Sequence, residues 1–195
     1  HLARASGALK QLDLTTVRWI PAGNPPHRAP PCVAAEHRLA MVVRAIANEP
    51  CFVLDASEVE SGAPSYTVDT LQRLRGIYGT RPLVLLLGAD AFLGIPRWHR
   101  WQELFELAHI AVATRPGYAL EAASMEVSLR AQYQRRHTSA ESGVAALASA
   151  PAGRIVSFDI PPLDISASGM RAELARGACV RGLVPHSVLD YISPN

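Results

Sequence analysis

A proline-rich segment holds two adjacent basic side chains that could bind a phosphate group. The segment IPAGNPPHR spans residues 20–28 and ends in His27 and Arg28. Its prolines restrict the backbone, and a histidine beside an arginine presents several hydrogen-bond donors to one anion. A solvated surface loop is the simpler interpretation, because proline turns are common. The segment alone therefore indicates either a phosphate site or an ordinary turn.

The segment GAPSYTVDTL, residues 62–71, has the composition of a helix start. The first N–H groups of a helix have no partners within it, so they could receive a carboxylate or a phosphate. Ser65 or Thr67 could instead cap the helix with its side chain. Sequence alone leaves both uses open.

The most apolar run of the chain ends in a glycine and an aspartate. In LGADAF, residues 87–92, Gly88 would let a ligand approach the backbone closely. Asp90 could accept hydrogen bonds from ribose hydroxyls. A helix cap formed by Asp90 is an equal alternative.

Aromatic and basic residues are mixed in PRWHRW, residues 96–101. Indole faces beside cations could hold a pyridine or purine ring. Trp101 has helical spacing to Leu104 and Phe105, so we expect it in the core. Trp98 is therefore the candidate for stacking on a ligand ring.

The segment DISASGMR, residues 164–171, combines two hydroxyl residues with an arginine about one turn into an expected helix. The hydroxyls of Ser166 and Ser168, the exposed N–H groups and the Arg171 guanidinium could converge on a polyphosphate. An ordinary capped helix with a surface arginine is the competing interpretation.

These segments need a scaffold, and the apolar pattern predicts a parallel sheet covered by helices. We expect strands at residues 17–20, 51–54, 83–87, 110–114 and 155–158. We expect helices at residues 1–12, 33–48, 68–78, 126–136, 168–176 and 185–192, and a flexible surface loop at 139–153. Ligands of such sheets bind at the carboxyl ends of the strands, so the candidate residues lie after strands as required.

The bulk composition narrows the class of protein. With 195 residues and 49% hydrophobic content, the chain fits a single domain of residues 1–195. A net charge of +2 gives no reason to expect nucleic acid or a membrane surface as a partner. Three cysteines argue against a disulfide framework or a cysteine-rich zinc site and favour the cytoplasm. The sequence leaves formation of a homo-oligomer open.

The order of elements at the start of the chain is unusual for this architecture. The predicted helix at residues 1–12 precedes the first predicted strand. A parallel nucleotide-binding sheet places a strand and a phosphate-binding loop before its first helix. We therefore expect the first strand of the sheet to lie upstream of His1.

In order and spacing, the segments resemble the bacterial nicotinate-nucleotide adenylyltransferase family of the HxGH nucleotidyltransferases. The matching pieces are IPAGNPPHR (20–28), APSYTVDTL (63–71), LLGADAF (86–92), PRWHRWQEL (96–104), TRPGY (114–118) and DISASGMR (164–171). The resemblance covers nearly the whole chain. The family's GxFDPxHxGH segment is the exception, and His1 corresponds to its last histidine.

The resemblance implies a Rossmann-like doubly wound parallel sheet and an adenylyl transfer from ATP to nicotinate mononucleotide, with Mg²⁺ carried on the ATP phosphates. The sequence shows no dedicated carboxylate cage, so we expect no metal site in the protein itself. The implied catalytic residues are His1 and Arg171. The implied ATP-binding residues are His1, Gly88, Asp90, Ser166, Ser168 and Arg171. The implied mononucleotide-binding residues are Asn24, His27, Arg28, Tyr66, Thr67, Trp98 and Arg115, with Tyr66 and Thr67 at the nicotinate carboxylate and Trp98 on the pyridine ring.

Two alternatives remain at this point. The same fold could adenylylate another phosphorylated acceptor such as phosphopantetheine, although the SYT segment and the tryptophans favour an aromatic acid. The chain could also be a nucleotide-binding sensor without catalytic activity.

Overall fold

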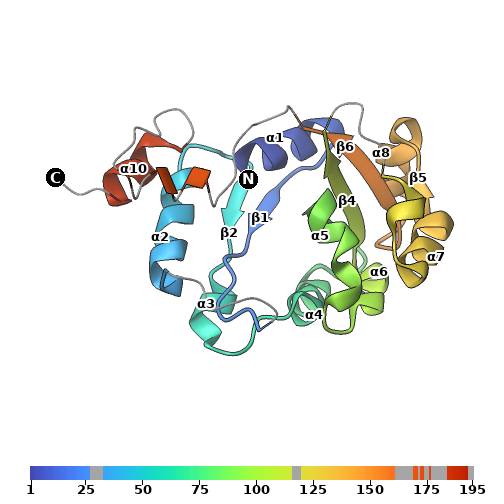
Figure 1. Ribbon diagram of the computed structural model, residues 1–195, viewed down its shortest axis with the longest axis horizontal. Coiled ribbons are helices and arrows are strands. Elements are labelled where there is room, and N and C mark those ends of the chain that lie inside the picture. Colours follow the sequence, from blue (N-terminus) through green and yellow to red (C-terminus); the bar gives the residue numbers. More distant parts are fainter. Residues whose placement is uncertain are drawn as a thin grey trace.

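The computed structural model describes residues 1–26, 33–115, 120–160, 169–170, 172–173, 176 and 184–192. Helices alternate with parallel strands along this part of the chain (Figure 1). The strands are β1 (Val17–Trp19), β2 (Phe52–Leu54), β3 (Val84–Gly88), β4 (His109–Thr114), β5 (His137–Thr138) and β6 (Ile155–Asp159). The helices are α1 (Leu2–Gln11), α2 (Ala35–Ile46), α3 (Ser57–Ser61), α4 (Thr67–Tyr78), α5 (Ala89–Leu93), α6 (Leu104–Leu107), α7 (Val127–Arg136), α8 (Ala140–Ala148) and α10 (His186–Ile192). Short 3-10 turns lie at Ile95–Arg97, Trp101–Glu103 and Ala122–Ser124.

Strand β4 is the buried centre of the larger sheet, whose order is β3-β4-β6-β5. Every residue of β4 is buried. Ile110 and Val112 lie in the core formed with α4, α5, α6 and α7, whereas Ala111 and Ala113 pack with residues of α1 and α8. Helices therefore cover both faces of this sheet, which confirms the predicted Rossmann-like doubly wound architecture.

Helix α1 connects the larger sheet to a smaller one made of β1 and β2. Val17 pairs with Phe52 in the smaller sheet. Ala5 of α1 packs in the core beside β2, while Ala8 and Leu12 of the same helix pack beneath β4 and β6. In Figure 1, α1 runs across the top of the molecule from one sheet to the other. One helix thus contributes to two hydrophobic clusters.

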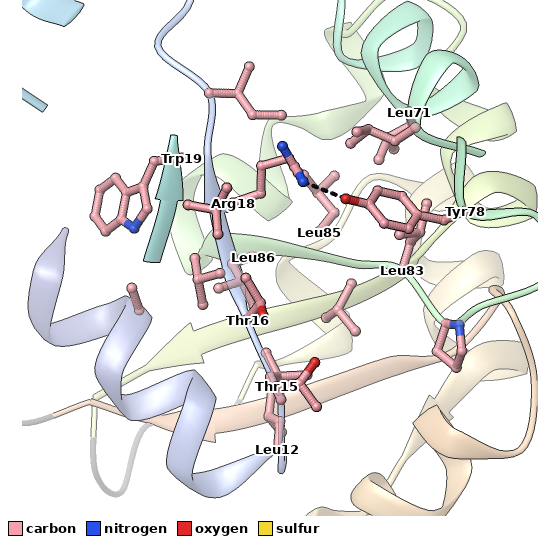
Figure 2. Close-up of a pocket in the computed structure, with 18 of the residues that line it drawn as sticks. Leu12, Thr15, Thr16, Arg18, Trp19, Leu71, Tyr78, Leu83, Leu85 and Leu86 are labelled. Carbon is pink, nitrogen blue, oxygen red and sulfur yellow. Dashed lines mark hydrogen bonds between the residues drawn. The ribbon is translucent and has the colours of Figure 1, made fainter. Parts of the chain in front are cut away.

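A slot separates β1 from β3. Within the described ranges, β1 pairs with β2 and β3 pairs with β4, and no strand pairs with the other edge of either. A cavity of about 900 Å³ lies between them and is lined by residues of β1, β3, α1 and α4. Figure 2 shows Leu85 and Leu86 of β3 in this cavity, where Arg18 of β1 donates a hydrogen bond to the Tyr78 hydroxyl. Unpaired strand edges with an apolar lining between covering helices resemble a strand position within a sheet.

The structure confirms the predicted strands and crossover helices to within a few residues at their ends. Trp101 is half-buried, packs on the main core and meets the Phe105 ring edge-on at 6.0 Å, as its spacing predicted. The helix predicted at 185–192 is α10, which packs on α2. Within the helix predicted at 168–176, the described residues 169–170 and 172–173 are helical.

The segment at residues 139–153 differs from the surface loop that its composition suggested. It contains α8, which buries Leu147 beneath β6. Gly143 faces β6 so closely that an added Cβ would lie 3.4 Å from Val156 Cγ1. The small residues of this segment, which have the composition of a linker, allow the helix to pack closely on the sheet. Alanine also has a high intrinsic helix propensity.

Among the described residues, His109 at the start of β4 is the most deeply buried titratable side chain. Its ring is fully buried; Nε2 lies 2.8 Å from the Ala150 carbonyl oxygen, and Nδ1 accepts a hydrogen bond of 3.0 Å from the Arg154 N–H. Protonation of Nδ1 would break the second bond. Burial, followed by the nearby arginines, lowers the pKa of His109 from its usual 6.5.

We expect His109 to make the fold less stable as the pH falls below about 6.5, because the unfolded chain then binds a proton that the folded chain excludes. Above that pH its contribution is constant. Urea unfolding between pH 5 and 8 measures this dependence. In the variant His109→Gln, the free energy of unfolding should depend less steeply on pH. The variant should also be less stable by about 1–3 kcal/mol at pH 8, because the buried Ala150 carbonyl and Arg154 N–H lose well-aligned hydrogen bonds. An unchanged slope would show that His109 is not responsible.

Candidate active site

Two loops that the sequence separates are joined at the carboxyl end of β1. Asn24 forms an isolated bridge with Pro64, and its carbonyl oxygen accepts a 2.9 Å hydrogen bond from the Ser65 N–H. The buried Ser65 Oγ accepts hydrogen bonds from the N–H groups of Gly23 and Asn24, at 3.0 and 3.1 Å. Asn24 is therefore held beside the start of α4, next to Tyr66 and Thr67.

Helix α4 begins without a side-chain cap. Its N-cap residue is Tyr66, and in the described part of the chain no capping side chain bonds to the first N–H groups. Ser65, which could have served as a cap, is instead used to hold the 20–28 loop. The backbone N–H groups of the first turn are therefore available to bind an anion, and the helix dipole strengthens that binding.

Gly23 sits where only glycine fits. A Cβ at this position would lie 2.0 Å from the Glu58 carbonyl oxygen and 2.7 Å from its carbon. Glu58 itself is tied to α4, because the Thr70 hydroxyl donates a 2.5 Å hydrogen bond to its carboxylate. The two loops and α3 therefore form one tightly packed corner.

A buried carboxylate holds the start of this corner in place. Asp55 accepts hydrogen bonds from the Ser57 N–H at 3.1 Å and from Arg73 Nη2 at 2.7 Å, and Arg18 Nη1 lies 3.6 Å away. Burial alone would raise the pKa of Asp55. The hydrogen bonds from Ser57 and Arg73 outweigh it and hold the pKa below its usual value.

Aromatic side chains border the start of α4. The Tyr66 and His99 rings lie 4.4 Å apart between centroids, tilted by 38°. Trp98, next to His99, is half-buried and packs partly on the main core. Arg100 Nη1 lies 3.5 Å from Asp69 Oδ1 in the first turn of α4, which ties this aromatic segment to the helix. Sequence spacing gave no signal for the Tyr66–His99 pair, because 32 intervening residues fold between them.

The end of β3 meets the start of α1. Gly88 is the last residue of β3, and a Cβ there would lie 2.8 Å from Arg4 Nη2. Arg4 Nε is buried and has no hydrogen-bond partner among the described residues, and burial lowers the pKa of this guanidinium. His1, the N-cap residue of α1, is exposed about one turn before Arg4. Arg4 therefore places a positive charge at the carboxyl end of β3, and the sequence motifs did not predict it.

The remaining described candidates lie along the same edge of the larger sheet. Asp90 is exposed in the first turn of α5 and does not cap that helix. Arg115 is exposed directly after β4, whose residue Ala113 pairs with Gly88. The carboxyl ends of β3 and β4 therefore present both residues on one side of the sheet.

Several predicted site residues lie outside the described residues, namely His27, Arg28, Ser166, Ser168 and Arg171. In the described ranges, no group of three or more His, Cys, Asp or Glu side chains is arranged to hold a metal ion. No helix there has the length and apolar character needed to cross a bilayer.

The fold and the arrangement of this edge define a nucleotidyltransferase of the cytidylyltransferase-like class, and the model of that family matches residues 1–172. Curated relatives narrow the assignment. A probable nicotinate-nucleotide adenylyltransferase of Dechloromonas aromatica is 50% identical over 98% of this chain and 88% of its own length. One of Stenotrophomonas maltophilia is 45% identical over 99% of this chain and 87% of its own. The chain belongs to the nicotinate-nucleotide adenylyltransferase family.

Solved structures agree with the fold. The nicotinic acid mononucleotide adenylyltransferase of Plasmodium falciparum, complexed with NaAD, superposes with a TM-score of 0.64. The match covers 98% of this chain and 87% of that one, at 16% sequence identity. This likeness supports the architecture, while the closer sequence relatives support the family.

Proposed function

We propose that the chain transfers the adenylyl group of ATP to nicotinate mononucleotide, giving nicotinate adenine dinucleotide and pyrophosphate. The observation that carries this proposal is the uncapped start of α4, held against the Asn24 loop and bordered by aromatic rings. Such a place suits an aromatic ring with a carboxylate. Membership of the family supports the same substrates.

In the proposed reaction, an oxygen of the mononucleotide 5′-phosphate attacks the α-phosphorus of ATP. A new P–O bond forms as the bond to the departing pyrophosphate breaks, and no covalent intermediate with the protein is required. The work of the protein is to align the two phosphates and to stabilise their charge. We assign the latter role to His1, Ser166, Ser168 and Arg171, and the ribose region of ATP to Gly88 and Asp90.

The mononucleotide would lie across the joined loops. Asn24, His27, Arg28 and Arg115 would hold its phosphate side, while the N–H groups at Thr67 receive the nicotinate carboxylate beside Tyr66. Trp98 would stack on the pyridine ring. Magnesium enters as part of the substrate, bound to ATP phosphate oxygens, and those oxygens with water suit its preferred ligand set.

Pyrophosphate release tests this function directly. With ATP and nicotinate mononucleotide we expect steady turnover, whereas nicotinamide mononucleotide should have a specificity constant lower by about 10⁴-fold or more, because its amide N–H₂ would face the N–H donors of α4. Binding of both nucleotides without release would identify a sensor instead. Equal specificity constants for acid and amide would contradict the assignment of Tyr66 and Thr67.

We also propose that a further parallel strand, joined to the start of α1, fills the slot between β1 and β3. The unpaired edges of both strands and the apolar cavity between them support this proposal. A strand there would run toward Gly88, so that the loop after it reaches the proposed phosphate site. The single domain would then contain one continuous sheet.

A further inference from the structure

A single arginine closes the loop that carries the basic candidates. Arg38, in the first turns of α2, donates from Nη1 to the Ala22 carbonyl oxygen, from Nη2 to the Gly23 carbonyl oxygen at 2.9 Å, and from Nε to the Val33 carbonyl oxygen at 3.2 Å. Ala22 and Gly23 precede the basic segment, and Val33 follows it. All three nitrogens of one guanidinium therefore connect the two ends of the loop.

The charge of Arg38 is not used in an ion pair within the described residues, where no carboxylate lies within salt-bridge distance of it. Two of its three bonds go to the carbonyl oxygens of Ala22 and Gly23, directly before Asn24, and the third goes to that of Val33. On the other side of the same backbone, Ser65 Oγ holds the N–H groups of Gly23 and Asn24. The loop is thus fixed from two sides, through its carbonyls and through its N–H groups.

We infer that Arg38 is a positioning residue for mononucleotide binding, which rests on the function proposed above. It fixes the backbone of Ala22 and Gly23, and Asn24 follows directly, so that the Asn24 side chain meets the substrate while Arg38 itself does not touch it. A lysine could not replace it, because an ammonium is a point donor, whereas the planar guanidinium reaches three carbonyls in fixed directions.

The chain offers a matched control in Arg130 of α7. Its Nε donates to the Ala122 carbonyl oxygen at 2.8 Å, and its Nη2 donates to the carbonyl oxygens of Ala123 and Met125 at 3.2 and 3.1 Å. This guanidinium holds a turn in the same way, but it has no part in the proposed site. The same substitution at either arginine therefore removes a similar set of hydrogen bonds.

The test measures dissociation constants for nicotinate mononucleotide and for ATP, by calorimetry, in the unmodified chain, Arg38→Lys and Arg130→Lys. We expect Arg38→Lys to weaken mononucleotide binding roughly ten- to a hundredfold, from the loss of one or two hydrogen bonds, with ATP binding changed less than about twofold. Arg130→Lys should leave both constants unchanged. Melting temperatures of both variants show whether they remain folded to a similar degree.

Three results would contradict the proposal, and each has a different meaning. Mononucleotide binding by Arg38→Lys that equals that of the unmodified chain would overturn the role of Arg38 alone. Equal weakening of both ligands would show a general structural role and overturn it as well. Failure of the unmodified chain to bind the mononucleotide would overturn the proposed function, and the inference with it.

Discussion

Replacing Gly23 with alanine will reduce binding of nicotinate mononucleotide by at least about a hundredfold, while the chain remains folded. The added methyl group would lie 2.0 Å from the Glu58 carbonyl oxygen, which no side-chain rotation can relieve. Either α3 or the Asn24 loop must move, and overpacking of this kind costs about 1–3 kcal/mol or more. Since Ser65 joins this loop to the start of α4, the displacement falls on the proposed substrate site. Calorimetric titration with the mononucleotide measures the effect.

Gly76 provides the matched control for Gly23. It lies within α4, and outside that helix's own backbone an added Cβ there would meet no atom of the described residues within 4 Å. Gly76→Ala should bind the mononucleotide normally and gain up to about 1 kcal/mol of stability, because alanine favours a helix. Normal binding by Gly23→Ala would show that the corner of α3 and the two loops does not form the substrate site.

A chain extended by one apolar strand before His1 will be more stable and more protected than the chain as it stands. A designed stretch of five valine and isoleucine residues, joined through a short glycine linker, could pair with the free edges of β1 and β3. We expect slower hydrogen exchange of amides in both strands. We also expect a melting temperature higher by at least about 5 °C, since each kcal/mol shifts a domain of this size by about 2–4 °C.

A control for this extension carries proline and glutamate in the middle of the added stretch, which prevents strand pairing. It should leave exchange in β1 and β3 unchanged. If the apolar extension also leaves that exchange unchanged, the slot is not a strand position and the proposed continuous sheet is wrong.

The sequence was informative where burial imposes a regular pattern. Strand β4 appears as an unbroken apolar run because both of its faces are covered, and α4 shows helical spacing at Leu71 and Leu74 because one face packs on the core. The segment containing α8 was misleading, since its small residues resemble a linker when their partner, Val156, is not known. Local pattern fails where distant packing decides the structure.

For the site, motif order predicted which segments matter but not how they are held together. The proximity of Asn24 to the start of α4 depends on Ser65, whose hydroxyl appeared to be an ordinary helix cap. Arg4 and Arg38 gave no signal, because Arg4 lies against the Gly88 backbone and Arg38 bonds to the carbonyl oxygens of Ala22, Gly23 and Val33. The roles of the described candidates, and of those outside the described residues, stay predictions.

Helix α1 has a consequence for the order in which the chain can be completed during synthesis. It is made well before β6, yet Ala8 packs with residues of β6, and Gln11 exchanges hydrogen bonds with the Asp159 backbone at 2.6 and 3.1 Å. These contacts join residues 148 positions apart. The side of α1 that carries Ala8 and Leu12 therefore stays uncovered until the ribosome has delivered β6, and contacts this distant in sequence slow folding. Chaperone binding to the nascent chain would be concentrated in that interval.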